Sequence, residues 1–162
     1  MSPEAESPDR WEHWLVHLLW AVSTRTSMLG EAALAKTGLT LAGLGLLENV
    51  NARPGITIAE ISRRAPQTQQ ALSQVAARLE GLGFVERRLA ERGGGRGVGL
   101  HLTGDGADAL ARAHRAAEAY EGMLVGELGA DRHRRLVDLL EEMRPIVTEL
   151  QRARAAGSAG SA

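Results

Sequence analysis

The chain contains no cysteine, which excludes a thiol redox sensor and a zinc site with cysteine ligands. Aromatic residues make up only 3% of the 162 residues, so leucine, valine and alanine must fill the core. No apolar run reaches the length of a membrane-spanning helix, and the first residues, MSPEAESPD, do not resemble a signal peptide. We therefore expect a cytoplasmic protein of one domain with no membrane partner.

The motifs of common enzymes are also missing. The sequence has no nucleophile elbow, no P-loop and no HExxH pair. The glycine-rich run 93–99 contains GxG, but a predicted strand follows it instead of the helix N-terminus that would hold a phosphate. We expect no enzyme activity, no cofactor and no metal site.

Positive charge is concentrated in the middle of the chain, although the net charge is only −1. Residues 53–104 carry eight arginines against four glutamates, a balance of +4. The flanking residues 1–52 and 105–162 balance at −3 and −2. A basic segment between acidic arms is typical of a local DNA-binding lobe.

Two short helices are predicted within this basic segment. Thr57 and Glu60 form a capping box that begins the first, and Pro66 ends it because proline disfavours the helical conformation of the preceding residue. Thr68 is a good N-cap for the second helix. Its apolar stripe is Leu72, Val75, Ala76 and Leu79.

A β-hairpin is predicted directly after these helices. Residues 84–89 and 98–102 favour strands, and the glycine-rich residues 91–97 favour the turn between them. Helix, turn, helix and hairpin together predict a winged helix-turn-helix, in a fold that is mainly α with a small β-hairpin wing.

These residues resemble the MarR family of dimeric transcription regulators. The resemblance covers about residues 8–154 and depends on an ordered set of positions: Leu39-Thr40, Ile61, Leu72, Val75-Ala76, Leu79-Glu80, Gly83-Phe84-Val85-Glu86-Arg87, Arg96 and Leu102-Thr103-Gly104-Asp105-Gly106. Pro66 and Gln67 depart from it, because a glycine and an apolar residue are usual there. Gly94-Gly95 also departs, since it replaces an aspartate and an arginine of the wing.

The resemblance implies a single domain over 8–154, with a DNA-binding lobe at 40–103. The helices of 8–36 and 104–154 would form a homodimer. Ser7 and Pro8 favour a helix start, Gly126 to Gly129 an interruption, and Pro145 a kink. The ends of the chain, 1–7 and 155–162, are expected to be disordered and flexible.

The polar face of the second short helix is the expected DNA contact, together with the wing. An ordinary solvated helix face is the alternative for these side chains, but glutamine, serine and arginine can also bind base edges and phosphates. Arg96 is expected to enter the minor groove, with Arg92 as its substitute. The candidate DNA-binding residues are Thr68, Gln69, Gln70, Ser73, Gln74, Arg78, Arg92 and Arg96.

A candidate ligand site lies in the first helix. His13, His17 and Trp20 share one helical face, because they are spaced at i, i+4 and i+7. The resemblance suggests a pocket for a small aromatic anion there, and ordinary packing is an equally good interpretation.

The sequence therefore predicts a regulator, more often a repressor in this family, that binds pseudo-palindromic double-stranded DNA as a homodimer. A small-molecule ligand would release it from the DNA. The alternative is a winged-helix module that binds proteins and has lost DNA binding.

Overall fold

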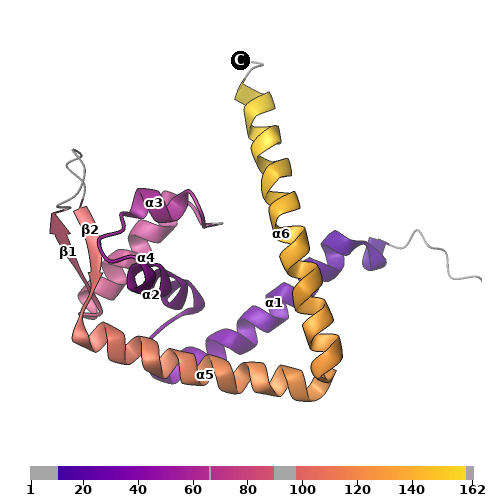
Figure 1. Cartoon of the computed structure of the whole chain (residues 1–162), viewed down its shortest axis with the longest axis horizontal. Coiled ribbons are helices and arrows are strands. Elements are labelled where there is room, and N and C mark those ends of the chain that lie inside the picture. The colour runs from indigo at the N-terminus through magenta and orange to yellow at the C-terminus, as the bar shows by residue number, and fades with distance from the viewer. Residues whose placement is uncertain (1–10, 66, 90–97, 160–162) are drawn as a thin grey trace, which may run out of the picture. The chain divides into compact units, whose positions relative to one another are not determined.

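A computed structural model describes residues 11–65, 67–89 and 98–159 (Figure 1). After a 3₁₀ turn at Trp11–His13, the elements in chain order are α1 (Leu15–Leu34), a second 3₁₀ turn (Ala35–Thr37), α2 (Leu41–Ala52), α3 (Ile58–Ser62), α4 (Gln69–Gly81), β1 (Val85–Leu89), β2 (Val98–Leu102), α5 (Gly104–Leu128) and α6 (Ala130–Ala159). The mainly helical fold with a small antiparallel hairpin confirms the predicted fold class.

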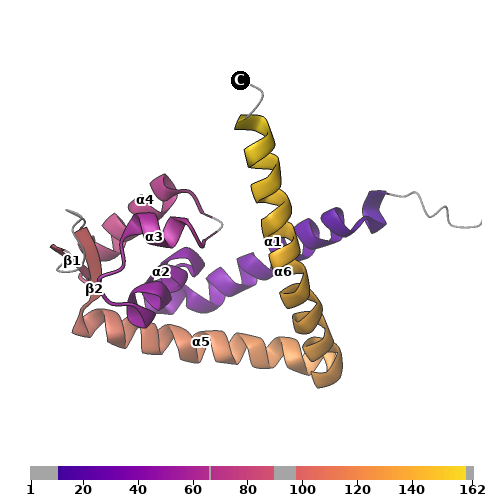
Figure 2. The same ribbon diagram turned by 45° about the horizontal axis from the view of Figure 1, so that its top comes forward.

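The chain forms two compact units, 1–118 and 119–162. The first unit contains the hydrophobic core, in which α2, α3, α4, the hairpin and the first half of α5 meet (Figure 2). Leucine, isoleucine, valine and alanine fill this core, as the shortage of aromatic residues requires. Its buried members are Leu34, Leu39, Leu46, Leu47, Val50, Ile56, Ile58, Ile61, Leu72, Ala76, Leu79, Val85, Leu100, Ala109, Leu110 and Ala113.

Helix α1 begins later than the sequence predicted. The expected start at Ser7 and Pro8 lies outside the described residues, but Trp14 has an extended backbone and serves as the N-cap of α1. The 3₁₀ turn before it is closed by a hydrogen bond from the Trp14 amide to the Trp11 carbonyl oxygen at 3.0 Å. The rings of Trp11 and His17 meet edge-on, with centroids 4.1 Å apart, and this contact accompanies the turn.

Gly43 is buried in α2 where this helix contacts α4. A Cβ at this position would lie 3.6 Å from side-chain carbons of both Leu39 and Leu79, an ordinary van der Waals distance. Helix α2 is capped by Thr40, whose hydroxyl accepts from the amide of Gly43 at 3.0 Å. This part of the lobe is therefore a packed contact.

The hairpin has an additional neighbour on its β2 edge. Within it, β1 and β2 pair antiparallel, with Val85 opposite Leu102 and Arg87 opposite Leu100. On the outer edge of β2, the amide of Leu100 donates to the carbonyl oxygen of Ile56 at 3.0 Å, and the amide of Gly55 donates to the carbonyl oxygen of Leu100 at 2.8 Å. The segment between α2 and α3 is thus tied to the wing.

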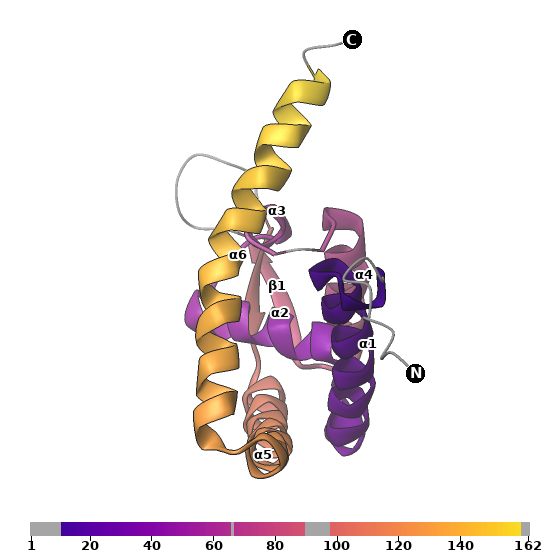
Figure 3. The same cartoon turned by 90° about the vertical axis from the view of Figure 1, so that its right-hand side faces the viewer.

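The second unit consists of the last part of α5 and the whole of α6. The interruption predicted between Gly126 and Gly129 falls at Gly129, where φ is +81°; α5 continues through Gly126 to Leu128, and α6 begins at Ala130. Helix α6 runs unbroken through Pro145 and continues to Ala159, so it includes residues 155–159 of the predicted tail (Figure 3). No described helix is long and apolar enough to cross a membrane.

Both end helices expose large apolar side chains in the single protomer. On α1 these include Leu15, Val16, Leu18, Val22, Met28 and Leu29. On α6 they are Leu136, Val137, Leu139, Leu140, Ile146, Val147 and Leu150. Exposed apolar surface of this extent marks an interface with another chain, which fits the predicted role of these helices in a homodimer.

Candidate nucleic-acid interface

The short helix α3 is fixed by the predicted capping box. The amide of Thr57 donates to Oε2 of Glu60 at 2.9 Å, and the amide of Glu60 donates to Oγ1 of Thr57 at 3.2 Å. The backbone and side-chain hydrogen bonds from Thr57 lower the pKa of the Glu60 carboxyl, and the charges of Arg53 and Arg63 lower it further. Arg53 forms an ion pair with Glu60 at 3.2 Å, which links the end of α2 to α3.

Helix α4 begins at the predicted cap and buries most of the predicted stripe. Oγ1 of Thr68 accepts from the amide of Ala71 at 3.2 Å. Leu72, Ala76 and Leu79 are buried, and Val75 is half-buried against the core. Because the opposite face of a helix must then point outward, α4 presents a polar row to solvent.

The structure separates the candidate DNA-binding residues of α4 by their environment. Gln69, Gln70 and Gln74 are exposed. Ser73 is half-buried, and its hydroxyl donates to the carbonyl oxygen of Gln69 at 2.8 Å, within the same helix. The exposed side-chain amides on this face of α4 are therefore those of the three glutamines.

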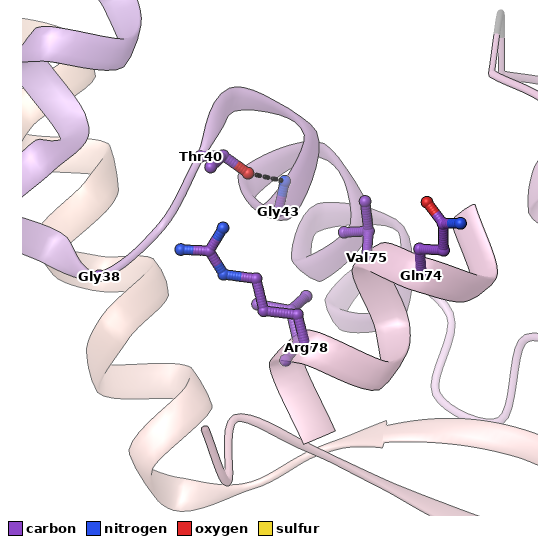
Figure 4. A pocket seen from close by; sticks show the side chains of 7 residues that line it. Gly38, Thr40, Gly43, Gln74, Val75 and Arg78 are labelled. Carbon is purple, nitrogen blue, oxygen red and sulfur yellow. Dashed lines mark hydrogen bonds between the residues drawn. The ribbon is translucent and has the colours of Figure 1, made fainter. Parts of the chain in front are cut away.

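Arg78 lies on one flank of α4, beside the start of α2. It lines a cleft of about 180 Å³ together with Gly38, Thr40, Gly43, Gln74, Val75 and Leu79. In Figure 4 its guanidinium points toward Thr40, while Gln74 extends from another part of the helix. Arg78 thus lies at the edge of the polar face of α4, and its contact with DNA stays a prediction.

Ion pairs take up most of the arginines near the hairpin. Nε of Arg87 lies 2.9 Å from Oε2 of Glu80, which joins β1 to α4, and Arg88 pairs with Glu86 on β1 itself. Among the described residues, no carboxylate forms an ion pair with Arg63, Arg64 or Arg78. These three exposed arginines are therefore the described arginines of the lobe whose charge is not paired.

Three predicted features of the site lie outside the described residues: Pro66 in the turn, and Arg92 and Arg96 in the wing. The assignment of the two arginines to DNA therefore stays a prediction. The strands that carry this wing are described, and they end at Leu89 and begin again at Val98.

The candidate ligand residues at the start of α1 are brought together only in part. The rings of His17 and Trp20 have centroids 5.8 Å apart, and the ring of Trp11 also contacts His17, edge-on. His13 is exposed and lies in the 3₁₀ turn before α1. The aromatic group is therefore Trp11, His17 and Trp20, and Trp11 was missed because the sequence placed it in a regular helix.

A short capped helix, a second helix with a polar outer face and a hairpin packed at its end define a winged helix-turn-helix, an architecture that binds duplex DNA. The sequence profile of the MarR family matches residues 37–97. HTH-type transcriptional repressor Rv2887 of Mycobacterium tuberculosis is 32% identical over 129 residues, which span 80% of this chain and 92% of the repressor. The chain belongs to the MarR family.

Solved structures of family members agree with this assignment. The Mycobacterium tuberculosis MarR family protein in complex with salicylic acid matches with a TM-score of 0.64 at 32% identity, over 80% of this chain and 96% of that chain. The transcriptional repressor CouR bound to a 23-mer DNA duplex matches with a TM-score of 0.75 at 26% identity, over 81% of this chain and 92% of that chain. The resemblance seen in the sequence is thus confirmed, and the chain is a DNA-binding transcriptional regulator.

Proposed function

We propose that the chain represses transcription by binding a pseudo-palindromic operator as a homodimer, and that a small aromatic anion releases it. The observation that supports this most directly is the exposed row of glutamines on α4, set between a capped helix and the hairpin. Relatives that are named as repressors and solved with DNA support the same function.

Each protomer would place α4 in one major groove. In helix-turn-helix dimers the two half-sites lie about one helical turn, roughly 34–36 Å, apart along the duplex. The side-chain amides of Gln70 and Gln74 can form paired hydrogen bonds with adenine in that groove. Arg78 on the flank of α4 would bind a phosphate, which supplies affinity without reading the sequence.

The aromatic group at the start of α1 is the proposed ligand site. Trp11 and Trp20 are 58% and 65% exposed in the protomer, so flat apolar surface is open beside the imidazole of His17. Stacking surface next to a hydrogen-bonding ring suits an aromatic acid, and a related protein was solved with salicylic acid. Packing within the dimer is the competing role for these rings.

The test begins with duplexes selected by the purified protein from a random pool, and with any inverted repeat in the DNA beside its own gene. Gel-shift and footprinting experiments at several salt concentrations should give one protected site with two symmetric halves. Affinity should fall steeply with salt, because phosphate contacts release counterions. A protein that binds no duplex more tightly than a neutral protein of its size would instead be an interaction module.

A further inference from the structure

The hairpin is attached to α4 at two separate levels. At its base, the amide of Phe84 donates to the carbonyl oxygen of Leu79 at 2.9 Å. Further along β1, Nε of Arg87 donates to Oε2 of Glu80 at 2.9 Å. The two attachments start from neighbouring residues of α4, Leu79 and Glu80, and they reach hairpin residues three positions apart, which is about 10 Å of extended chain. The ion pair therefore adds a second point at which the hairpin is held to α4.

Buried Val85 and Leu100 also pack the hairpin against the core, but among the described residues its other hydrogen bonds and ion pairs do not reach α4. Ile56 is bonded to Leu100 on the far edge of β2, and it belongs to the link between α2 and α3. The pair of Arg88 with Glu86 lies within β1, so it joins no two elements. Among the described side chains, the Glu80–Arg87 pair is thus the ion pair that connects the hairpin to the DNA-reading helix.

We propose that Glu80 is a positioning residue: through Arg87 it holds β1 at the angle that lets α4 and the hairpin contact one duplex together. The inference rests on the proposed function, because it concerns how the lobe fits DNA. Arg87 then acts within the lobe, and the positive charge that meets phosphates comes from other arginines.

This positioning role predicts that removal of the Glu80 carboxylate lowers the affinity for DNA, which is opposite to the effect of its charge alone. Glu80 is an exposed carboxylate on the helix that enters DNA, so its removal should strengthen binding if only its charge mattered. If Glu80 positions the hairpin, its removal should weaken binding. The loss cannot exceed the strength of the ion pair itself, and two exposed pairs per dimer can supply about a 2- to 30-fold change in affinity.

The experiment compares the full-length protein with Glu80→Met, Arg87→Met and the double variant on the selected operator duplex. Methionine keeps the length of the side chain but cannot hold the pair. Each single change should weaken binding by a similar factor, the double change should weaken it no further, and the slope of affinity against salt should stay the same. The exchange of Glu80→Arg with Arg87→Glu should recover most of the affinity.

Glu86→Met is the matched control, because it removes a neighbouring carboxylate whose partner is on the same strand. It should leave operator binding unchanged or make it tighter. The unfolding midpoint of every variant is measured alongside. If the Glu80→Met variant binds the operator as tightly as the unchanged protein does, the inference is overturned.

A lower salt slope in Arg87→Met, by about 0.9 for each phosphate that the variant no longer binds, also overturns it, since Arg87 would then be a phosphate ligand. Failure of the unchanged protein to bind any duplex is a different result. It overturns the proposed function, and the positioning role with it.

Discussion

The carbonyl oxygen of Phe84 occupies the space where a side chain at Gly106 would begin. A Cβ on Gly106 would lie 1.9 Å from that oxygen and 2.8 Å from the carbonyl carbon. The obstacle is backbone at the start of the hairpin, so it cannot rotate away as a side chain could. Gly106 is therefore the residue that lets α5 lie directly against the base of the wing.

We expect Gly106→Ala to destabilise the protein by roughly 1–3 kcal/mol, the usual cost of overpacking, and to fall near the upper end of that range. Gly104→Ala on the same turn of α5 is the control, because a Cβ there meets nothing within 4 Å. Chemical unfolding at one protomer concentration compares the two. Equal midpoints for both variants would show that α5 and the hairpin shift apart at little cost.

Arg78→Ala should weaken binding to operator and unrelated duplexes by the same factor. Its guanidinium lies on the flank of α4 beside Thr40, so we expect it to bind a phosphate and not a base edge. The salt slope should fall by about 0.9 for each phosphate that the variant no longer binds. Fluorescence anisotropy with both duplexes over a salt series measures the two quantities.

Gln74→Ala, one turn earlier on α4, provides the contrast for Arg78→Ala. It should reduce the preference for the operator by roughly 1–3 kcal/mol if the amide makes a paired contact with a base, and it should leave the salt slope unchanged. If Arg78→Ala instead reduced the preference for the operator, or Gln74→Ala changed the slope of affinity against salt, Arg78 would be the base contact or Gln74 the phosphate contact.

The acid side of the stability profile should depend on Glu60. Hydrogen bonds from Thr57, followed by the charges of Arg53 and Arg63, lower its pKa below the ordinary value of 4.5. A carboxyl whose pKa is lower in the folded state stabilises the fold fully above that ordinary value, and this contribution is lost as the pH falls through the folded pKa. Stability should therefore decline below about pH 5.

Glu60→Gln should flatten this decline, because the amide can still accept the hydrogen bonds but does not titrate. Glu118→Gln, an exposed change on α5, serves as the control and should keep the steep acid limb. Thermal unfolding from acid to neutral pH follows all three proteins. A decline of the same steepness in Glu60→Gln would assign the acid sensitivity to other carboxyls.

Local hydrogen bonding explains why so much of the lobe was predictable from sequence. Thr40, Thr57, Thr68 and Thr103 each cap a helix through the amide three residues later, so each signal lies within one turn of chain. The spacing of apolar residues likewise identified the buried stripe of α4 and the two strands. These features need no information about distant neighbours.

Features that depend on distant neighbours were missed. Nothing in the sequence singled out the packing of Gly106, which lies in close contact with the backbone of Phe84 in another part of the chain. The sequence likewise did not show that Arg87 on β1 forms an ion pair with Glu80 on α4. The predicted interruption between Gly126 and Gly129 is present but is confined to Gly129; α5 continues through Gly126, because one glycine costs a helix only about 1 kcal/mol.

The last prediction concerns the aromatic group that we propose as the ligand site. An aromatic acid bound against Trp11, His17 and Trp20 would release DNA only if it binds the DNA-incompetent conformation more tightly than the competent one. A typical coupling of 1–3 kcal/mol corresponds to a fall in operator affinity of roughly 5–150-fold.

Salicylic acid and related acids are first screened by thermal shift. Operator release is then measured for the unchanged protein and for His17→Ala combined with Trp20→Ala. Release should persist in a control, Ser27→Ala on the exposed part of α1, and should be abolished in the double variant. Equal release from all three proteins would mean that the ligand binds elsewhere and that these rings only pack.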